Sequence, residues 1–229
     1  MEVDPPLPKC VFLFDVDNTL LDNDAVVADL RRHLIDTFGD ASAERYWQGF
    51  EELRRELGYA DYLGALQRYR AVGGNDPQLL SISSFLIDYP FADRLYADAR
   101  AALQHAARHG PTVILSDGDV VFQPRKVQRS GLWEAVGGRV LIYIHKEATL
   151  DDMQRRYPAD RYVMVDDKLR ILTAMKAALG DRLTTVFVRQ GHYALDPALS
   201  GTYPAADVTI ERIGDLRGID LAASFPGAR

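Results

Sequence analysis

The sequence predicts an α/β protein with a Rossmann-like, mainly parallel sheet, helices on both faces, and a helical cap inserted after the first strand. Three observations support this fold. Short apolar runs that favour β-structure alternate with helical patterns along most of the 229 residues. The first of these runs ends directly at two closely spaced aspartates. Between residues 24 and 89 no strand pattern occurs, and apolar residues recur at helical spacing instead.

Short, largely apolar runs predict the strands of the sheet. They cover residues 11–14, 112–115, 140–144, 162–165 and 185–188. Runs without polar alternation are typical of strands that are covered on both faces. Parallel sheets bind ligands beyond the carboxyl ends of their strands, where loops and helix N-termini converge. Polar residues that directly follow these runs are therefore candidates for a functional site.

The segment between the first and second predicted strands is expected to form four helices. Their apolar faces are interrupted near Gly39, Gly58, Gly73 and Pro90, which are helix-ending residues. We therefore predict a cap domain at residues 23–90 and a core domain at residues 1–22 and 91–229. Residues 20–23 and 88–93 would be the two hinges. The two ends of the chain, residues 1–8 and 222–229, are candidates for disorder.

Composition narrows the class of function. The formal net charge is -6, and no block of basic residues occurs, so the sequence favours a small-molecule substrate over nucleic acid or a membrane surface. The single cysteine, Cys10, precedes an apolar run and is expected to be buried, and it excludes an internal disulfide. No signal peptide or membrane span is evident, so a cytoplasmic location is expected. The sequence leaves open a monomer or a homodimer.

Two aspartates directly follow the first predicted strand. Asp15 and Asp17 are two positions apart at the end of a buried run. Residues with this spacing point to the same side of a strand, and charged carboxylates do not pack in a hydrophobic core. The chain must leave the sheet here and present both acids in the crevice at the sheet edge. The alternative is structural, because Asp and the following Asn18 often cap turns or helices.

Further polar residues follow the next predicted strands. Ser116, Asp117 and Gly118 come after the second strand, where a hydroxyl and backbone N–H groups are suited to bind a phosphate, although Ser-Asp-Gly is also an ordinary turn. Lys146 follows the third strand and is either an active-site cation or a solvated surface charge.

A second acidic pair, Asp166 and Asp167, ends the fourth predicted strand. Two like charges about 4 Å apart repel by about 4 kcal/mol at an effective dielectric constant near 20. If this pair lies beside the first one, the acids require a cation. Carboxylate oxygens without Cys or His select a hard ion, for which Mg²⁺ is the expected cofactor.

The order of these groups, D-x-D-x-T at Asp15, then Ser116, Lys146 and the Asp166–Asp167 pair, resembles the four motifs of the haloacid dehalogenase-like hydrolases. The spacing between them agrees, and the resemblance covers nearly the whole chain. An insertion directly after the first motif is similar to the helical-cap branch, which includes phosphoglycolate phosphatase-like and phosphoglucomutase-like members. Asn18 stands where the family commonly has Gly, and Glu147 follows the lysine in place of the frequent proline.

The resemblance implies magnesium-dependent hydrolysis of a small phosphate monoester, a phosphorylated metabolite. Asp15 would attack phosphorus and form an aspartyl-phosphate, and Asp17 would act as general acid and then as general base. Lys146 would balance the charge of the nucleophile. The expected phosphate-binding groups are Ser116, Asp117 and Gly118, and the expected metal ligands are Asp15, Asp17 through its backbone carbonyl, Asp166 and Asp167.

Several alternatives remain open at this stage. Lys126 and Lys168 are rivals for the active-site lysine, although Lys126 is expected on a helix surface. A phosphomutase would use the same acids, a non-catalytic scaffold would keep only the fold, and a phospho-acceptor signalling module would not suit the cap. By resemblance, Asp17 argues against dehalogenation, because a departing halide needs no acid. The many Arg and Tyr residues of the cap, and residues 189–193, either form a solvated face or close over the substrate.

Overall fold

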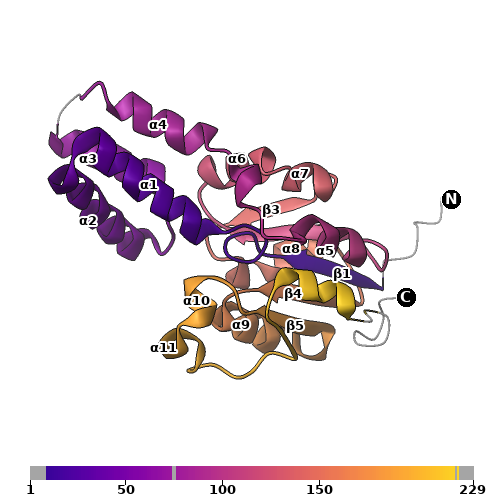
Figure 1. Ribbon diagram of the computed structural model, residues 1–229. Helices are drawn as coiled ribbons and strands as arrows, with labels where there is room; N and C mark the ends of the chain where they lie inside the picture. Colours follow the sequence, from indigo (N-terminus) through magenta and orange to yellow (C-terminus); the bar gives the residue numbers. More distant parts are fainter. Residues whose placement is uncertain (1–8, 74–75, 220, 222–229) are drawn as a thin grey trace.

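The computed structural model describes residues 9–73, 76–219 and 221, and its centre is a six-stranded sheet in the order β3-β2-β1-β4-β5-β6 (Figure 1). All pairings between neighbouring strands of this sheet are parallel. The strands are β1 (Cys10–Phe14), β2 (Thr112–Asp117), β3 (Val140–Tyr143), β4 (Arg161–Asp166), β5 (Leu183–Val188) and β6 (Val208–Ile210). The predicted α/β fold is confirmed. The short edge strand β6 was not predicted, because its three residues lie in a polar segment without a distinct apolar run.

Alternate side chains of β1 enter two separate hydrophobic clusters, one on each face of the sheet. Phe12 and Phe14 belong to one cluster, whereas Val11 and Leu13 belong to the other, and all four are buried. This is why the run carries no polar alternation: a central strand covered on both faces has no solvent-facing side.

Helices cover both faces, as predicted. The first face carries α5 (Ala99–Ala106), α6 (Phe122–Arg129), α7 (Leu132–Ala135) and the 3₁₀ helix η4 (Ile213–Gly218). The second face carries α8 (Leu150–Arg156), α9 (Leu169–Leu179) and α10 (Gly191–Leu195). The remaining short helices are α11 (Pro197–Ser200), η1 (Phe91–Arg94), η2 (Lys146–Ala148) and η3 (Gly180–Arg182).

The segment between β1 and β2 begins with the four predicted helices, which we call the cap. These are α1 (Asn23–Phe38), α2 (Asp40–Leu57), α3 (Tyr62–Gly73) and α4 (Leu79–Asp88), and Figure 1 shows them grouped beyond one end of the sheet. Helix α2 ends at Gly58, whose left-handed φ of 79° is costly for residues with a Cβ. Within the cap, Phe50 stacks on Tyr62, and Tyr62 also contacts the ring of Phe122 in α6, so the aromatic packing continues from the cap into the core.

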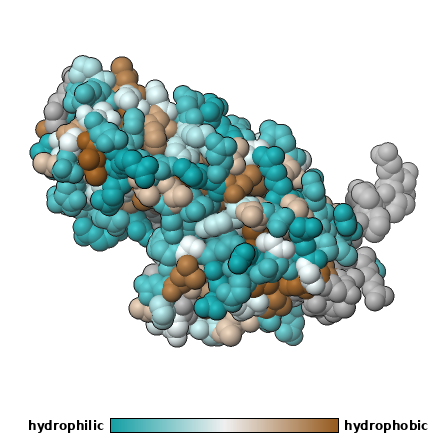
Figure 2. All heavy atoms as spheres, in the orientation of Figure 1, coloured by the Kyte–Doolittle hydropathy of each residue, from teal (hydrophilic) through white to brown (hydrophobic). Residues whose placement is uncertain are grey.

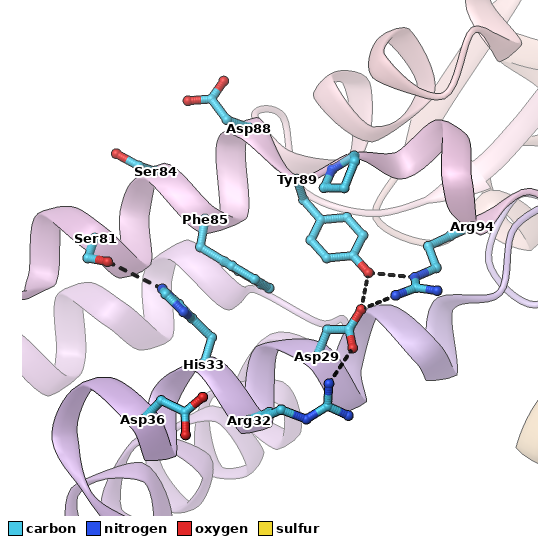
Figure 3. Close-up of a pocket in the computed structure, with 11 residues that line it drawn as sticks. Asp29, Arg32, His33, Asp36, Ser81, Ser84, Phe85, Asp88, Tyr89 and Arg94 are labelled. Atoms are coloured by element: carbon cyan, nitrogen blue, oxygen red, sulfur yellow. Dashed lines mark hydrogen bonds and ion pairs between the residues drawn. The ribbon is translucent and has the colours of Figure 1, made fainter.

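The two connections between cap and core run side by side. Leu21 and Leu95 form an antiparallel bridge, and the Asp22 N–H donates to the carbonyl of Arg94 at 2.8 Å. A second contact joins α1 to the connection after α4. In a groove of about 710 Å³, Asp29 of α1 accepts hydrogen bonds from both Tyr89 and Arg94 (Figure 3). Both connections therefore lie at one edge of the cap. The ends predicted to be disordered, residues 1–8 and 222–229, lie outside the described residues.

The surface is predominantly hydrophilic on the face shown in Figure 2, with isolated apolar side chains between polar ones. Large exposed apolar residues are distributed over cap and core; they are Ile35, Leu57, Val72, Leu80, Val120, Val121, Ile144, Leu195 and Tyr203. Among the described helices, none combines the length and the hydropathy that crossing a bilayer requires.

Tyr46 provides a test of the cap's internal packing. Its side chain is fully buried, and its hydroxyl donates to the carbonyl of Tyr62 at 3.0 Å, joining α2 to α3. We expect Tyr46→Phe to lower the free energy of unfolding by about 1–2 kcal/mol, because it leaves a buried carbonyl without its partner. Urea denaturation followed by circular dichroism measures this change. The same substitution at half-exposed Tyr203 should change stability by less than about 0.5 kcal/mol; equal effects at both positions would contradict the packing argument.

Candidate active site

Three carboxylates meet at the carboxyl ends of β1 and β4. The two strands are neighbours, and the Asp15 N–H continues their pairing by donating to the carbonyl of Val165 at 3.0 Å. Asp15, Asp166 and Asp167 each offer a carboxylate oxygen within 4.8 Å of the others, and all three residues are buried. The two acidic strand ends therefore lie side by side, as the sequence pattern predicted.

This cluster is suited to a divalent cation. Within the described residues, both carboxylate oxygens of Asp167 are buried without a hydrogen-bond partner. Burial is the main cause that raises the pKa of Asp167 well above its usual value, although the Lys168 ammonium opposes the shift. Burial likewise raises the pKa of Asp166 to about 6, against the opposing charge of Lys146. Unsatisfied carboxylate oxygens in a site without thiolate or imidazole ligands match the donor set of a hard ion such as Mg²⁺.

Lys146 lies against the carboxylates. Its ammonium is buried, forms an ion pair with Asp15, lies 2.7 Å from Asp166 and donates to the carbonyl of Leu115 at 3.3 Å. Burial disfavours its charge, but the surrounding carboxylates outweigh this cost and raise the pKa of Lys146 above its ordinary value. The backbone N–H of Lys146 donates to Asp117 at 2.7 Å, which fixes the start of η2. Glu147, in place of proline, does not prevent the lysine from reaching the acids.

The residues after β2 have distinct partners. The Ser116 hydroxyl donates to Asp15 at 3.4 Å, so it faces the acidic cluster. The N–H of Gly118, which was expected to be free for a phosphate, donates to the carbonyl of Tyr143 at 2.9 Å. The pairing of β2 with β3 continues beyond residue 115, where the predicted strand ended, and it occupies this donor. Asp117 turns its carboxylate to the backbone of Lys146 rather than into the acidic cluster.

The loop after β1 is held by its own polar side chains. The Thr19 hydroxyl donates to Asp15 at 3.3 Å, which holds the loop against the nucleophile position. Asn18 has a left-handed φ of 61°, a conformation that Asn tolerates, and its side-chain oxygen accepts from the N–H groups of Asn23 and Asp24. Asn18 therefore joins the active-site loop to the start of α1, a contact that the sequence pattern did not reveal.

Asp17 points to α6 instead of the carboxylate cluster. Its carboxylate accepts from Lys126 at 2.6 Å and from Gln123 at 3.4 Å. The expectation that Lys126 lies on a helix surface was wrong: its side chain is 1% exposed, because α6 packs this face against the loop after β1. The Asp17 side chain thus points away from the acidic cluster, and a contribution of its backbone carbonyl to a metal site stays a prediction. Gln123 was not singled out from the sequence. Its spacing of one helical turn from Lys126, which places both side chains on the same face of α6, was the feature that could have identified it.

A cavity of about 550 Å³ opens in front of these groups, between cap and core. Asp17, Lys126 and Lys168 line it from the core, and Arg31 and Arg54 line it from the cap. Aromatic and histidine side chains complete the wall; they include Trp47, Tyr59, Tyr62, His145, His192 and Tyr193. The cavity has room for a small metabolite, and Asp17 and Asp117 bring acidic side chains of the core into its lining.

Only part of the arginine-rich cap faces this cavity. Arg54 donates to the Tyr193 hydroxyl across the cavity, which joins α2 to α10. Arg31 lies over the ring of Trp47 at 4.7 Å. By contrast, Arg68 pairs with Glu56 on the exposed surface of the cap. Some arginines of the cap are therefore solvated, whereas others line the cavity; their closure over a substrate stays a prediction.

Solved structures of other proteins share this architecture. A haloacid dehalogenase-like hydrolase from Burkholderia xenovorans LB400 is 67% identical, with a TM-score of 0.89 over 93% of this chain and 99% of that chain. L-2-haloacid dehalogenase from Xanthobacter autotrophicus is 19% identical, with a TM-score of 0.60 over 96% of this chain and 100% of its own. The magnesium-bound HAD-hydrolase YfnB from Bacillus subtilis is 15% identical, with a TM-score of 0.62 over 93% of this chain and 100% of its own.

The two more distant similarities concern the fold alone. None of the curated proteins compared with this chain matches it. The family model for haloacid dehalogenase-like hydrolases matches residues 11–179, a range that runs from β1 to the end of α9 and includes all four sequence motifs. On this evidence, and with a 67% identical relative of the same description, the chain is an enzyme that belongs to the haloacid dehalogenase-like hydrolase family.

Proposed function

We propose that this enzyme hydrolyses a small phosphate monoester with Asp15 as nucleophile and Mg²⁺ as cofactor. The observation that carries the proposal is the shared buried volume of Asp15, Asp166, Asp167 and Lys146. A carboxylate held beside an ammonium and two further acids is suited to attack a dianionic phosphate only if a cation offsets their repulsion. The cavity of about 550 Å³ supports a small phosphorylated metabolite as the substrate.

Asp15, Asp166 and Asp167 would hold the magnesium ion, together with the backbone carbonyl of Asp17. When bound, Mg²⁺ would neutralise charge between the nucleophile and the phosphoryl oxygens. Both oxygens of Asp167 lack a hydrogen-bond partner within the described residues, which supports its assignment as a ligand.

The side chains around Asp15 have separate roles in the two steps of the proposed reaction. In the first step, an Asp15 oxygen forms a bond to phosphorus while the bond from phosphorus to the leaving oxygen breaks. Lys146 balances the developing charge, and the Ser116 hydroxyl binds a phosphoryl oxygen. Asp17, which is 25% exposed at the cavity, takes up a proton from solvent before this step and gives it to the leaving oxygen. In the second step, Asp17 takes a proton from the water that attacks the aspartyl-phosphate, which releases phosphate and restores Asp15.

Two alternative reactions use the same acids. A phosphomutase would return the phosphoryl group to its substrate, and its activity would depend on a bisphosphorylated activator. Dehalogenation is the activity for which the Xanthobacter autotrophicus protein is named. Asp17 favours phosphate ester hydrolysis over dehalogenation, because an alkoxide leaving group needs a proton and a halide does not.

Replacing the nucleophile tests the reaction. We expect Asp15→Asn to lower phosphatase activity by roughly a thousandfold or more, because the amide oxygen is a poor nucleophile. The measurement is phosphate release from a panel of phosphate monoesters, with 2-chloropropionate as a dehalogenase substrate. Asp151→Asn, on an exposed position of α8, is the control and should retain wild-type activity. Halide release by the wild type without any phosphate release would overturn the proposed reaction.

Replacing a metal ligand tests the cofactor without an activity assay. Saturating Mg²⁺ at about 100 times its Kd should stabilise the wild type by about 2.7 kcal/mol, which appears as a higher melting temperature than in EDTA. Asp167→Asn should abolish this rise. In EDTA the variant should melt higher than the wild type, since an unpaired carboxylate is no longer buried. An undiminished response of Asp167→Asn to Mg²⁺ would exclude Asp167 as a ligand.

The effect of Mg²⁺ on melting should also depend on pH. Burial raises the pKa of Asp166 from its ordinary value of 3.8 to about 6, so without metal the folded protein retains a proton between these two values. This proton stabilises the metal-free fold at low pH, and the stabilisation is lost as the pH rises through about 6. Magnesium competes with the proton. We therefore expect a larger Mg²⁺-induced rise in melting temperature at about pH 7.5 than at about pH 5, with ionic strength matched by KCl. An equal rise at both pH values would contradict this coupling.

A further inference from the structure

The carboxylate of Asp17 is held at both oxygens by one face of α6. Lys126 donates to Oδ1 at 2.6 Å, and Gln123, one helical turn earlier, donates to Oδ2 at 3.4 Å. Gln123 also donates to the Ser116 hydroxyl at 3.0 Å, and this hydroxyl in turn donates to Asp15. Helix α6 thus connects Asp17 to the group that faces the nucleophile.

The close approach of α6 depends on a glycine. A Cβ on Gly118 would lie 2.6 Å from the Cβ of Gln123, which no side chain at that position could accommodate without displacement of the helix. The absence of a side chain at Gly118 therefore allows α6 to pack close to the active site. This gives Gly118 a packing role beside its predicted place in the phosphate-binding loop.

Lys126 is buried where an ammonium is costly. Its side chain is 1% exposed, and among the described residues its ion pair is with Asp17. The ammonium also donates to the Asn23 side chain at 2.9 Å and lies 5.1 Å from the ring centre of Phe122. Burying a cation is unfavourable unless its charge and its hydrogen bonds are satisfied, and Asp17 and Asn23 satisfy them here.

The structure therefore contains two buried active-site lysines with different partners. Lys146 contacts Asp15 and Asp166, on the side where phosphorus is attacked. Lys126 contacts Asp17, on the side where the leaving group is protonated, and Asn23, which is the first residue of α1. Asp17 is 25% exposed at the cavity, so without Lys126 its carboxylate would keep only the longer hydrogen bond from Gln123 and would be less well fixed.

We propose that Lys126 is a positioning residue that fixes the Asp17 carboxylate for proton transfer to the leaving oxygen. This inference rests on the proposed phosphatase activity and adds a specific role for α6. Proton transfer is efficient only within hydrogen-bond distance, so the orientation of the carboxylate decides how well it serves the leaving group. Because Lys126 also binds Asn23, the orientation of Asp17 is tied to the first helix of the cap.

Two aryl phosphates of nearly equal shape distinguish this role from general damage to the site. Phenyl phosphate releases a basic phenolate that benefits from a proton, whereas 4-nitrophenyl phosphate releases a weaker base that departs without one. We expect Lys126→Met to slow first-turnover release of phenol by roughly 10- to 100-fold and release of 4-nitrophenol by much less. Rapid-quench measurement of the first turnover isolates this step from the later hydrolysis of the aspartyl-phosphate.

Matched variants complete the test. Lys126→Arg should recover part of the phenol release, since a guanidinium can again donate to Asp17. In an Asp17→Asn background, Lys126→Met should cause no further loss, because the lysine acts through that carboxylate. Lys176→Met removes an ammonium with two hydrogen bonds at the far end of α9 and should leave both substrates unaffected. The Mg²⁺-induced rise in melting temperature should persist in Lys126→Met, which shows that the acidic cluster is intact.

Each outcome has a definite meaning. Slowing that is equal for the two esters, or a full additional loss in the Asp17→Asn background, overturns the positioning role while leaving the phosphatase proposal in place. If the wild type releases phosphate from none of the esters of the panel, these two aryl phosphates included, the phosphatase proposal itself fails, and the role of Lys126 fails with it.

Discussion

Three carboxylates and one ammonium share a buried volume at the carboxyl ends of β1 and β4, and the geometry of the active site depends on this arrangement. Asp15, Asp166 and Asp167 repel one another, and the ammonium groups of Lys146 and Lys168 offset only part of this repulsion. The excess negative charge is retained because strand pairing fixes the backbone on both sides. The repulsion between these acids therefore lowers the stability of the metal-free fold, and it makes the site complementary to a divalent cation.

The second half of the site lies on α6 and faces the cap. Lys126 and Gln123 orient Asp17, and Asn18 joins the same loop to the start of α1. In the proposed reaction, residues at the strand ends would attack phosphorus, and residues in contact with the cap would protonate the leaving group. This division gives the cap a physical route to influence the chemistry besides the shape of the cavity.

The sequence predicted those features that depend on strand ends. Buried runs that terminate in Asp15, Lys146 and Asp166 identify the edge where these residues meet, since parallel strands place their carboxyl ends together. The sequence alone does not show which face of a short polar helix is buried. Lys126 and Gln123 lie on a short helix whose polar residues all resemble surface residues, and only tertiary packing distinguishes the buried pair. The edge strand β6 and the hydrogen bond of the Gly118 N–H were not predicted, because both depend on strand pairing near the edges of the sheet.

The adjacency of the two connections has a consequence for how the molecule was assembled. The chain leaves the core at Asp22 and returns at Arg94, where a backbone hydrogen bond of 2.8 Å joins the two points. An insertion whose ends lie this close adds little loop-closure entropy as it grows, and its length places no geometric demand on the strands. A different helical insert could thus leave and re-enter the core at the same two junctions, and substrate preference could diverge while the acidic end of the sheet stayed unchanged.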